Sequence, residues 1–117
     1  MSSGTKDFDA ITGSNNPGIK GLRGTGAVET LTQFSAMSKA AMADGTLDKK
    51  MKELIALSIG VATHCDGCIG FHTKALKRLG ASDEEVSEAL GVTVYMGGGP
   101  SLMYAADAWN AWQALKD

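Results

Sequence analysis

The apolar positions follow a helical period over most of the chain from residue 27 onwards. In residues 27–43 apolar side chains recur at intervals of three and four, which predicts an amphipathic helix. A second helix is expected to start near Thr46 or Asp48, either of which can cap it, and to run to Thr63. Three more helices are expected over residues 65–79, over residues 82–94 and from Pro100 onwards.

The second of these helices contains the run Leu54–Thr63, which carries no charge. Apolar content alone would also fit a buried strand. The residues leading into the run, from Asp48 to Leu54, strongly favour helix, and no turn signal separates them from it. We therefore expect one helix that is apolar nearly all round in its second half, as in a protein core or a subunit contact.

Residues 1–26 have a different character, with six glycines and Pro17 among them. This density of turn-forming residues predicts an irregular N-terminal arm. Four apolar residues could still dock the arm: Phe8, Ile11, Ile19 and Leu22. The sequence thus predicts an all-α fold of about five helices, with an arm over residues 1–26 and a helical domain over residues 27–117.

Length and charge narrow the class of protein. A chain of 117 residues with 44% hydrophobic residues fits one domain with a core of its own. The formal net charge of -2 gives no electrostatic reason to expect a nucleic acid or an anionic membrane as partner. No segment approaches the roughly 20 apolar residues that cross a bilayer, and no apolar secretory segment is seen, so we expect a cytoplasmic protein.

The two cysteines are the main chemical signal. Cys65 and Cys68 are three residues apart, so a bond between them would close a very short loop and stabilise the fold little. On a helix, Cys65, Cys68 and His72 share one face, with the cysteines in the first turn. Free N–H groups and the helix dipole favour a thiolate there, and His72, at i+4 from Cys68, can exchange protons with it.

A carboxylate would complete a proton relay, and Glu53 is the last charge before the apolar run. If the helices on either side of residue 64 pack antiparallel, Glu53 comes within reach of His72. A glutamate against an apolar surface has a raised pKa and can transfer protons near neutral pH.

The cysteines have two other interpretations. They could be small buried hydrophobic residues, although this spacing at a helix start is hard to attribute to packing. They could also bind zinc together with His72 and a fourth ligand, either His64 or Asp66. Structural zinc normally uses two ligand pairs from separate segments, and the chain has no second pair. We therefore expect neither a metal nor a cofactor.

The combined pattern of Glu53, eleven residues, Cys65-x-x-Cys68 and then His72 after three more residues resembles a known family. It is similar to the alkylhydroperoxidase (AhpD-like) branch of the carboxymuconolactone decarboxylase family. The Ala-Leu-Ser-Ile-Gly-Val-Ala run before Cys65 and the segment Gly80–Glu85 fit as well. The likeness covers roughly residues 30 to 112.

The resemblance implies an all-helical fold that assembles as a homotrimer, or as a homohexamer built from trimers. It implies that Cys68 is the attacking thiol, that Cys65 completes the disulfide, and that Glu53 and His72 relay protons. The implied reaction reduces a peroxide, such as an organic hydroperoxide, or the disulfide of a peroxiredoxin partner. Electrons come from a thiol donor, and the process belongs to antioxidant defence.

One position departs from the pattern. Better-studied members of the branch carry a second histidine just before the second cysteine, where this chain has Gly67, and His64 stands before Cys65 instead. The branch with lactone decarboxylase activity usually lacks the cysteine pair, so the pair argues against that activity. Two alternatives stay open: a thioredoxin-like electron carrier, and a non-enzymatic helical oligomer that senses oxidation and binds a partner.

Overall fold

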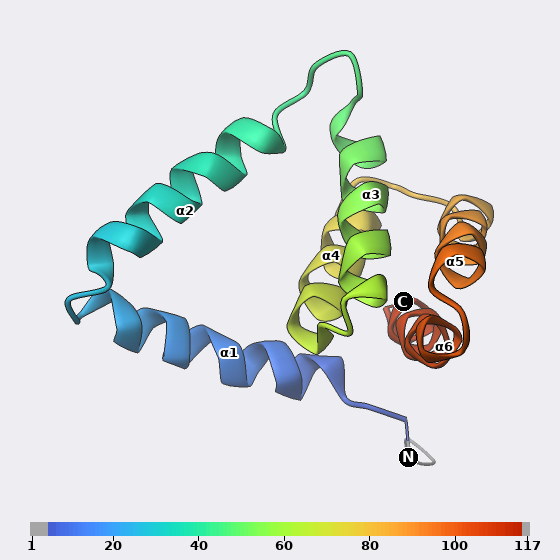
Figure 1. Cartoon of the computed structure of the whole chain (residues 1–117), viewed down its shortest axis with the longest axis horizontal. Helices are drawn as coiled ribbons and strands as arrows, with labels where there is room; N and C mark the ends of the chain where they lie inside the picture. The colour runs from blue at the N-terminus through green and yellow to red at the C-terminus, as the bar shows by residue number, and fades with distance from the viewer. Residues whose placement is uncertain (1–4, 116–117) are drawn as a thin grey trace.

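The computed structural model describes residues 5–115, and within that range the chain forms six helices and no strand (Figure 1). The expected all-α fold is therefore confirmed. In chain order the helices are α1 (Phe8–Arg23), α2 (Val28–Ala41), α3 (Lys49–Ala62), α4 (Asp66–Arg78), α5 (Asp83–Gly97) and α6 (Gly99–Ala114). None of these described helices combines the length and the apolar character that a bilayer span requires.

The apolar run that could have been a strand lies in α3. Asp48 caps this helix, because its Oδ1 accepts a hydrogen bond of 2.8 Å from the backbone N–H of Met51. The run continues the helix up to Ala62 without interruption. The strand alternative is thus wrong, and so is the thioredoxin-like carrier, whose fold required that strand.

The core lies between α3, α4, α5 and α6. Helices α3 and α4 lie side by side, and α5 and α6 pack against them (Figure 1). The largest completely buried aliphatic side chains at the centre are Leu57, Val61, Ile69, Leu76 and Val86. Each of α3, α4 and α5 thus contributes to one continuous core, which fixes how the helices that carry the candidate site face each other.

The structure at the end of α4 and at the start of α5 agrees with the prediction from the sequence. Gly80 follows α4 with a φ of 76°, the left-handed conformation that glycine adopts without strain. Ser82 and Glu85 form the expected capping box: Glu85 N–H donates to Ser82 Oγ, and Ser82 N–H donates to Glu85 Oε1. The backbone hydrogen bond from Ser82, together with Lys50, lowers the pKa of Glu85.

The N-terminal segment differs from the prediction. Residues 8–23 form α1, so an irregular arm is wrong for this stretch, and residues 1–4 of the predicted arm lie outside the described residues. Asp7 caps the helix by accepting a hydrogen bond from the N–H of Ala10 at 3.1 Å. Glycine and proline disfavour helix only as intrinsic preferences, and the tertiary contact of α1 with α4 outweighs them.

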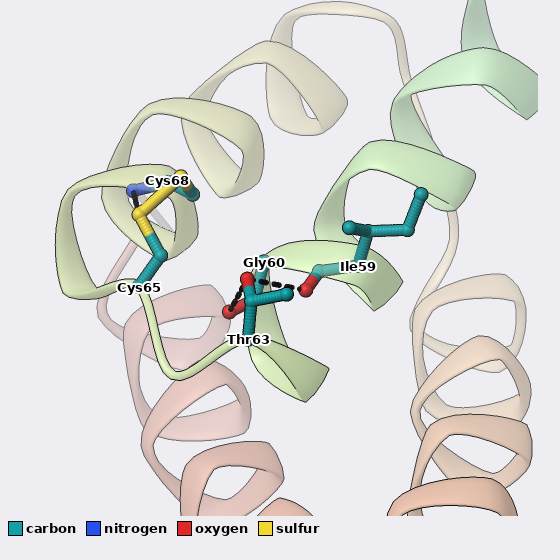
Figure 2. Close-up of a disulfide and its surroundings, with 5 residues drawn as sticks. All are labelled: Ile59, Gly60, Thr63, Cys65 and Cys68. Atoms are coloured by element: carbon teal, nitrogen blue, oxygen red, sulfur yellow. Dashed lines mark hydrogen bonds between the residues drawn. A yellow bond between two sulfur atoms is a disulfide. The ribbon is translucent and has the colours of Figure 1, made fainter.

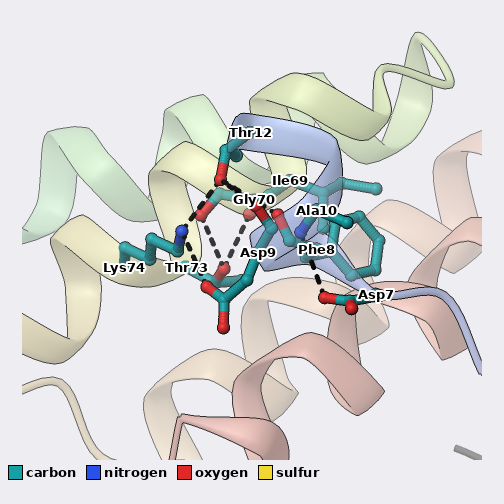
Figure 3. Close-up of polar contacts among 9 residues, drawn as sticks. All are labelled: Asp7, Phe8, Asp9, Ala10, Thr12, Ile69, Gly70, Thr73 and Lys74. Carbon is teal, nitrogen blue, oxygen red and sulfur yellow. Dashed lines mark hydrogen bonds and ion pairs between the residues drawn. The ribbon is translucent and has the colours of Figure 1, made fainter. Parts of the chain in front are cut away.

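That contact joins a buried face of α1 to the small residues of α4 (Figure 3). Phe8 and Thr12 are buried against α4, and a Cβ on Gly70 would lie 2.5 Å from Thr12 Cγ2. Lys74 of α4 donates a 2.8 Å hydrogen bond to Thr12 Oγ1 and lies 2.9 Å from Asp9 Oδ1. Docking of α1 therefore depends on the absence of a side chain at Gly70.

Helix α2 extends away from the core and meets α1 at the turn that joins the two helices, so that α1 and α2 form a bent limb beside the rest of the molecule (Figure 1). Over the described residues α2 buries none of its side chains. Phe34 and Met37 are 61% and 60% exposed. The division into separate units at residues 26 and 27 stays a prediction.

We predict that Gly70→Ala lowers the free energy of unfolding by about 1–3 kcal/mol, because its methyl group would overpack the α1–α4 contact. The matched control is Gly91→Ala in α5, where no atom lies within 4 Å of the added Cβ. The control should raise the free energy by about 0.5–1 kcal/mol, since alanine favours helix over glycine. Urea titration measures both, and equal effects would contradict the prediction.

Candidate active site

The two cysteines lie at the N-terminus of α4 and are joined in a disulfide (Figure 2). Cys65 is the N-cap residue and Cys68 the third residue of the helix, with their Cα atoms 5.2 Å apart. The backbone N–H of Cys68 donates to Cys65 Sγ at 3.1 Å. The sulfur of Cys65 thus takes the place of the oxygen that usually caps a helix, where N–H groups and the helix dipole stabilise negative charge.

A tight turn after α3 presents this pair. Thr63 ends α3 and its hydroxyl donates to the carbonyl of Ile59 at 2.8 Å, while the N–H of Cys65 donates to the carbonyl of Gly60 at 2.9 Å. A Cβ on Gly60 would lie 2.9 Å from the Cβ of Cys68, closer than unstrained carbon atoms approach. The glycine therefore lets the end of α3 lie directly against the cysteines (Figure 2).

His64 forms the corner of the turn, with a φ of 59°. Few residues other than glycine adopt this left-handed conformation without a cost in free energy. Its ring stacks on Tyr104 of α6 at a centroid distance of 4.6 Å and an interplanar angle of 21°. This aromatic contact fixes the orientation of His64 immediately before the first cysteine.

Glu53 and His72 meet across α3 and α4, as the antiparallel arrangement predicted. The distance between His72 Nδ1 and Glu53 Oε1 is 2.6 Å, which is a short hydrogen bond. Glu53 is only 12% exposed and His72 30% exposed, so the pair is partly shielded from water. His72 lies one helical turn after Cys68 on the same face of α4. The roles assigned to the four residues in catalysis stay predictions.

Gly67, where a second histidine was missing from the pattern, lies against α1. A Cβ at this position would come within 2.8 Å of Asn15 Oδ1. A histidine there would have to displace Asn15, so the observed docking of α1 requires glycine at position 67. His64 does not occupy this space, because its ring stacks on Tyr104.

A group of side chains next to the cysteines was not identified from the sequence. Lys6 Nζ lies 2.8 Å from Asp66 Oδ1 and 2.8 Å from Asp107 Oδ2. It also lies 4.6 Å from the centroid of the Tyr104 ring. The hydrogen bonds to Asp107 and Asp66 raise the pKa of Lys6. Only Asp66, between the cysteines, carried a signal in the sequence, because the other residues are remote along the chain.

The described part of the chain contains no cluster of metal-ligating side chains. Over residues 5–115, no three His, Cys, Asp or Glu side chains are grouped so that they could hold a metal ion. The groups that come together are therefore the disulfide, the Glu53–His72 hydrogen bond and the ionic cluster at Lys6.

Comparison with known proteins gives consistent results. The sequence profile of the carboxymuconolactone decarboxylase family matches residues 29–111. An uncharacterised protein of Cupriavidus necator is 39% identical over 95 residues, which cover 81% of this chain and 84% of that protein. An uncharacterised protein of the cox locus of Paracoccus denitrificans is 41% identical over 75 residues, covering 64% of this chain and 68% of that protein.

Two solved structures share the fold. A carboxymuconolactone decarboxylase family protein from Legionella pneumophila superposes with a TM-score of 0.90 at 48% identity, covering 94% of this chain and 97% of that one. A family member from Thermotoga maritima, for which involvement in an antioxidative response has been suggested, has a TM-score of 0.79 at 28% identity. This second match covers 90% of this chain and 89% of that one.

The left-handed turn at His64 gives a prediction about stability. His64→Gly should leave the free energy of unfolding within about 1 kcal/mol of the parent, because glycine adopts this conformation freely. His64→Val should lie about 1–2 kcal/mol below the glycine variant. Both variants lose the stack on Tyr104, so their difference isolates the backbone cost. Urea unfolding that gave equal values would contradict the prediction.

Proposed function

The chain belongs to the carboxymuconolactone decarboxylase family, and on that premise we propose that it is a thiol-dependent peroxidase or disulfide reductase of the alkylhydroperoxidase type. The observation that carries the proposal is the Cys65–Cys68 pair at the N-terminus of α4. A bond between neighbouring residues of one helix end can open and close with little movement of the backbone.

The reaction starts from the reduced pair. The thiolate of Cys68 attacks one oxygen of the peroxide, the O–O bond breaks, and Cys68 becomes a sulfenic acid while an alkoxide leaves. The Cys65 thiolate then attacks the Cys68 sulfur, the S–S bond forms, and the hydroxyl group leaves as water after taking up a proton. The peroxide is reduced by two electrons, and the two cysteines are oxidised by two.

Protons for the leaving groups come from the pair next to the cysteines. His72 lies one turn after Cys68 on α4 and passes a proton, directly or through water, to the alkoxide. The carboxylate of Glu53 holds the imidazole in place through its contact with Nδ1. Shielding of this pair from solvent strengthens the interaction between them.

Turnover needs a thiol donor, which reduces the Cys65–Cys68 disulfide and becomes a disulfide itself. With a peroxiredoxin disulfide as acceptor in place of the peroxide, the reduced pair transfers its two electrons by thiol–disulfide exchange and again becomes the Cys65–Cys68 disulfide. Either activity fits antioxidant defence, and the suggestion made for the Thermotoga relative supports it. The cytoplasmic location expected from the sequence stays a prediction.

We also propose that the protein works as a homotrimer or homohexamer. A groove of about 540 Å³ runs along α3 and α5, and its apolar lining is Met51, Leu54, Ile55, Ile59, Ala89 and Val92. The same chain exposes Phe34 and Met37 on one side of α2. Burial of such surfaces against a neighbouring copy would contribute roughly 25 cal/mol for each Å² of apolar area removed from water. If the α1–α2 limb of each copy lies in the α3–α5 groove of the next copy, the contacts can close into a ring.

The activity of cysteine and relay variants tests the catalytic proposal. Cys68→Ser should abolish peroxide consumption, whereas the reduced Cys65→Ser variant, with no thiol donor present, should consume one equivalent and then stop as a sulfenic acid, since no second thiol closes the disulfide. Glu53→Gln should lower kcat/KM by about 10- to 100-fold through loss of the relay. Steady-state consumption of an organic hydroperoxide with a dithiol donor measures the Cys68 and Glu53 variants, and mass spectrometry after peroxide treatment without a donor measures Cys65→Ser.

The matched control for Glu53→Gln is Glu84→Gln, an exposed carboxylate in α5, which should keep the parent rate. Full turnover by the Cys68→Ser variant would contradict the proposal. A parent protein that is oxidised once by peroxide but is not returned to the dithiol by any thiol donor would instead favour the non-enzymatic redox-sensing module.

Assembly is tested by a charge on the exposed face of α2. Phe34→Asp should convert the oligomer to smaller species, because a carboxylate would have to be buried in the contact. Thr32→Asp is the control, since residue 32 lies about 200° around the helix from residue 34 and points elsewhere. Light scattering after size-exclusion chromatography gives the masses. A monomeric parent, or an intact Phe34→Asp oligomer, would disprove this mode of assembly.

A further inference from the structure

The ionic cluster at the cysteine turn has no part in the chemistry described so far. Lys6 is held by two carboxylates at 2.8 Å each, one on α4 and one on α6, and its ammonium lies over the ring of Tyr104. A lysine with three such partners has a fixed position, unlike an isolated surface lysine. The residue precedes α1, so it connects the N-terminal segment to two helices of the core.

The cluster adjoins the cysteine turn through Asp66 and Tyr104. Asp66 lies between Cys65 and Cys68 in the first turn of α4. Tyr104 and Asp107 lie one turn apart on α6, and Tyr104 also stacks on His64, directly before Cys65. A change in the charge of this cluster therefore alters the electrostatic field at the helix end that carries the two sulfur atoms.

The charges in the cluster have opposite effects on a thiolate. Free N–H groups at the start of α4 favour negative charge on sulfur, but the two carboxylates oppose it. Lys6 neutralises one of these two negative charges. The side chains of Lys6, Asp66 and Asp107 are 35%, 38% and 26% exposed, so solvent screens the effect in part and we expect a moderate size.

We propose that Lys6 is a positioning residue that acts through Asp66 and Asp107 to increase the fraction of reactive thiolate in the reduced cysteine pair near neutral pH. The consequence for turnover rests on the proposed function, whereas the effect on the thiols does not. The N-terminal segment, outside the residues matched by the family profile, thereby contributes to the chemistry of the site.

Other titratable groups also face the cysteine turn. They are Glu53 on α3, His72 on α4, Tyr104 on α6 and His64 in the turn itself, and Asp7 follows Lys6 as the N-cap of α1. Glu53 and His72 are paired with each other. All of these groups remain in every variant below, so their contributions cancel when the variants are compared with the parent.

The experiment measures the rate of iodoacetamide alkylation of the fully reduced protein from about pH 5 to pH 9, which follows the thiolate fraction. Lys6→Met should shift the pH midpoint of alkylation upward by roughly half a pH unit, because it removes a positive charge. Asp107→Asn should shift the midpoint downward by a similar amount, because it removes a negative charge. Lys6→Arg, which keeps the charge, should retain the midpoint of the parent.

The two expected midpoint shifts have opposite signs, and this distinguishes an effect of charge from an effect of a loosened structure. Lys6→Met and Asp107→Asn break the same ion pair, so a purely structural effect would move both midpoints in the same direction. Lys74→Met is the control: it breaks the ion pair with Asp9 between α1 and α4, about 9 Å further along α4 than Cys68. Its midpoint should equal that of the parent.

Shifts of equal sign, an unshifted Lys6→Met variant, or a Lys74→Met variant that matches Lys6→Met would each overturn the proposal. Alkylation requires no turnover, so it decides the role of Lys6 even if the parent consumes no peroxide. A parent that turns over while Lys6→Met keeps the parent midpoint would overturn the role of Lys6 alone. A parent without turnover and with the expected shifts would overturn only the proposed function.

Discussion

The close approach of α3 to α4 at Gly60 and Cys68 is the constraint on which the rest of the site depends. A side chain at residue 60 would collide with Cys68, so only glycine allows the two helix ends to lie this close. The same antiparallel contact brings Glu53 against His72 further along the pair. The distance between the helices at one residue thus determines both where the disulfide lies and whether Glu53 reaches His72.

The opposite side of α4 is held in a similar way. Gly67 and Gly70 leave room for Asn15 and Thr12 of α1, which could not approach a helix with larger side chains at these positions. Helix α4 therefore starts between two helices that contact it closely. The N-terminal segment that docks in this way also delivers Lys6 to the cysteine turn, so the packing of α1 and the charge near the sulfurs are connected.

Apolar residues outside the core form two exposed surfaces on the same chain, one on α3 and one on α2. Ile55 and Ile59 lie on the side of α3 that faces the groove with α5, and Phe34 and Met37 lie on α2. The apolar character of α3 around its whole circumference is explained if one side belongs to the core and the other to a contact between copies. Helix α3 thus contributes one side to the core of the chain and, in the proposed assembly, the other side to the contact between copies.

The sequence by itself determined the helices from α2 to α6, the capping box at Ser82, and the spacing that places Cys65, Cys68 and His72 on one helix face, because these depend on interactions between near neighbours. It did not determine α1. Glycine and proline there suggested irregular chain, and only the contact with Gly70 shows why a helix forms. The partners of Lys6 and the stack of His64 on Tyr104 were also decided by tertiary structure. Contacts between residues remote in the sequence leave no periodic signal, and they form only when the helices pack.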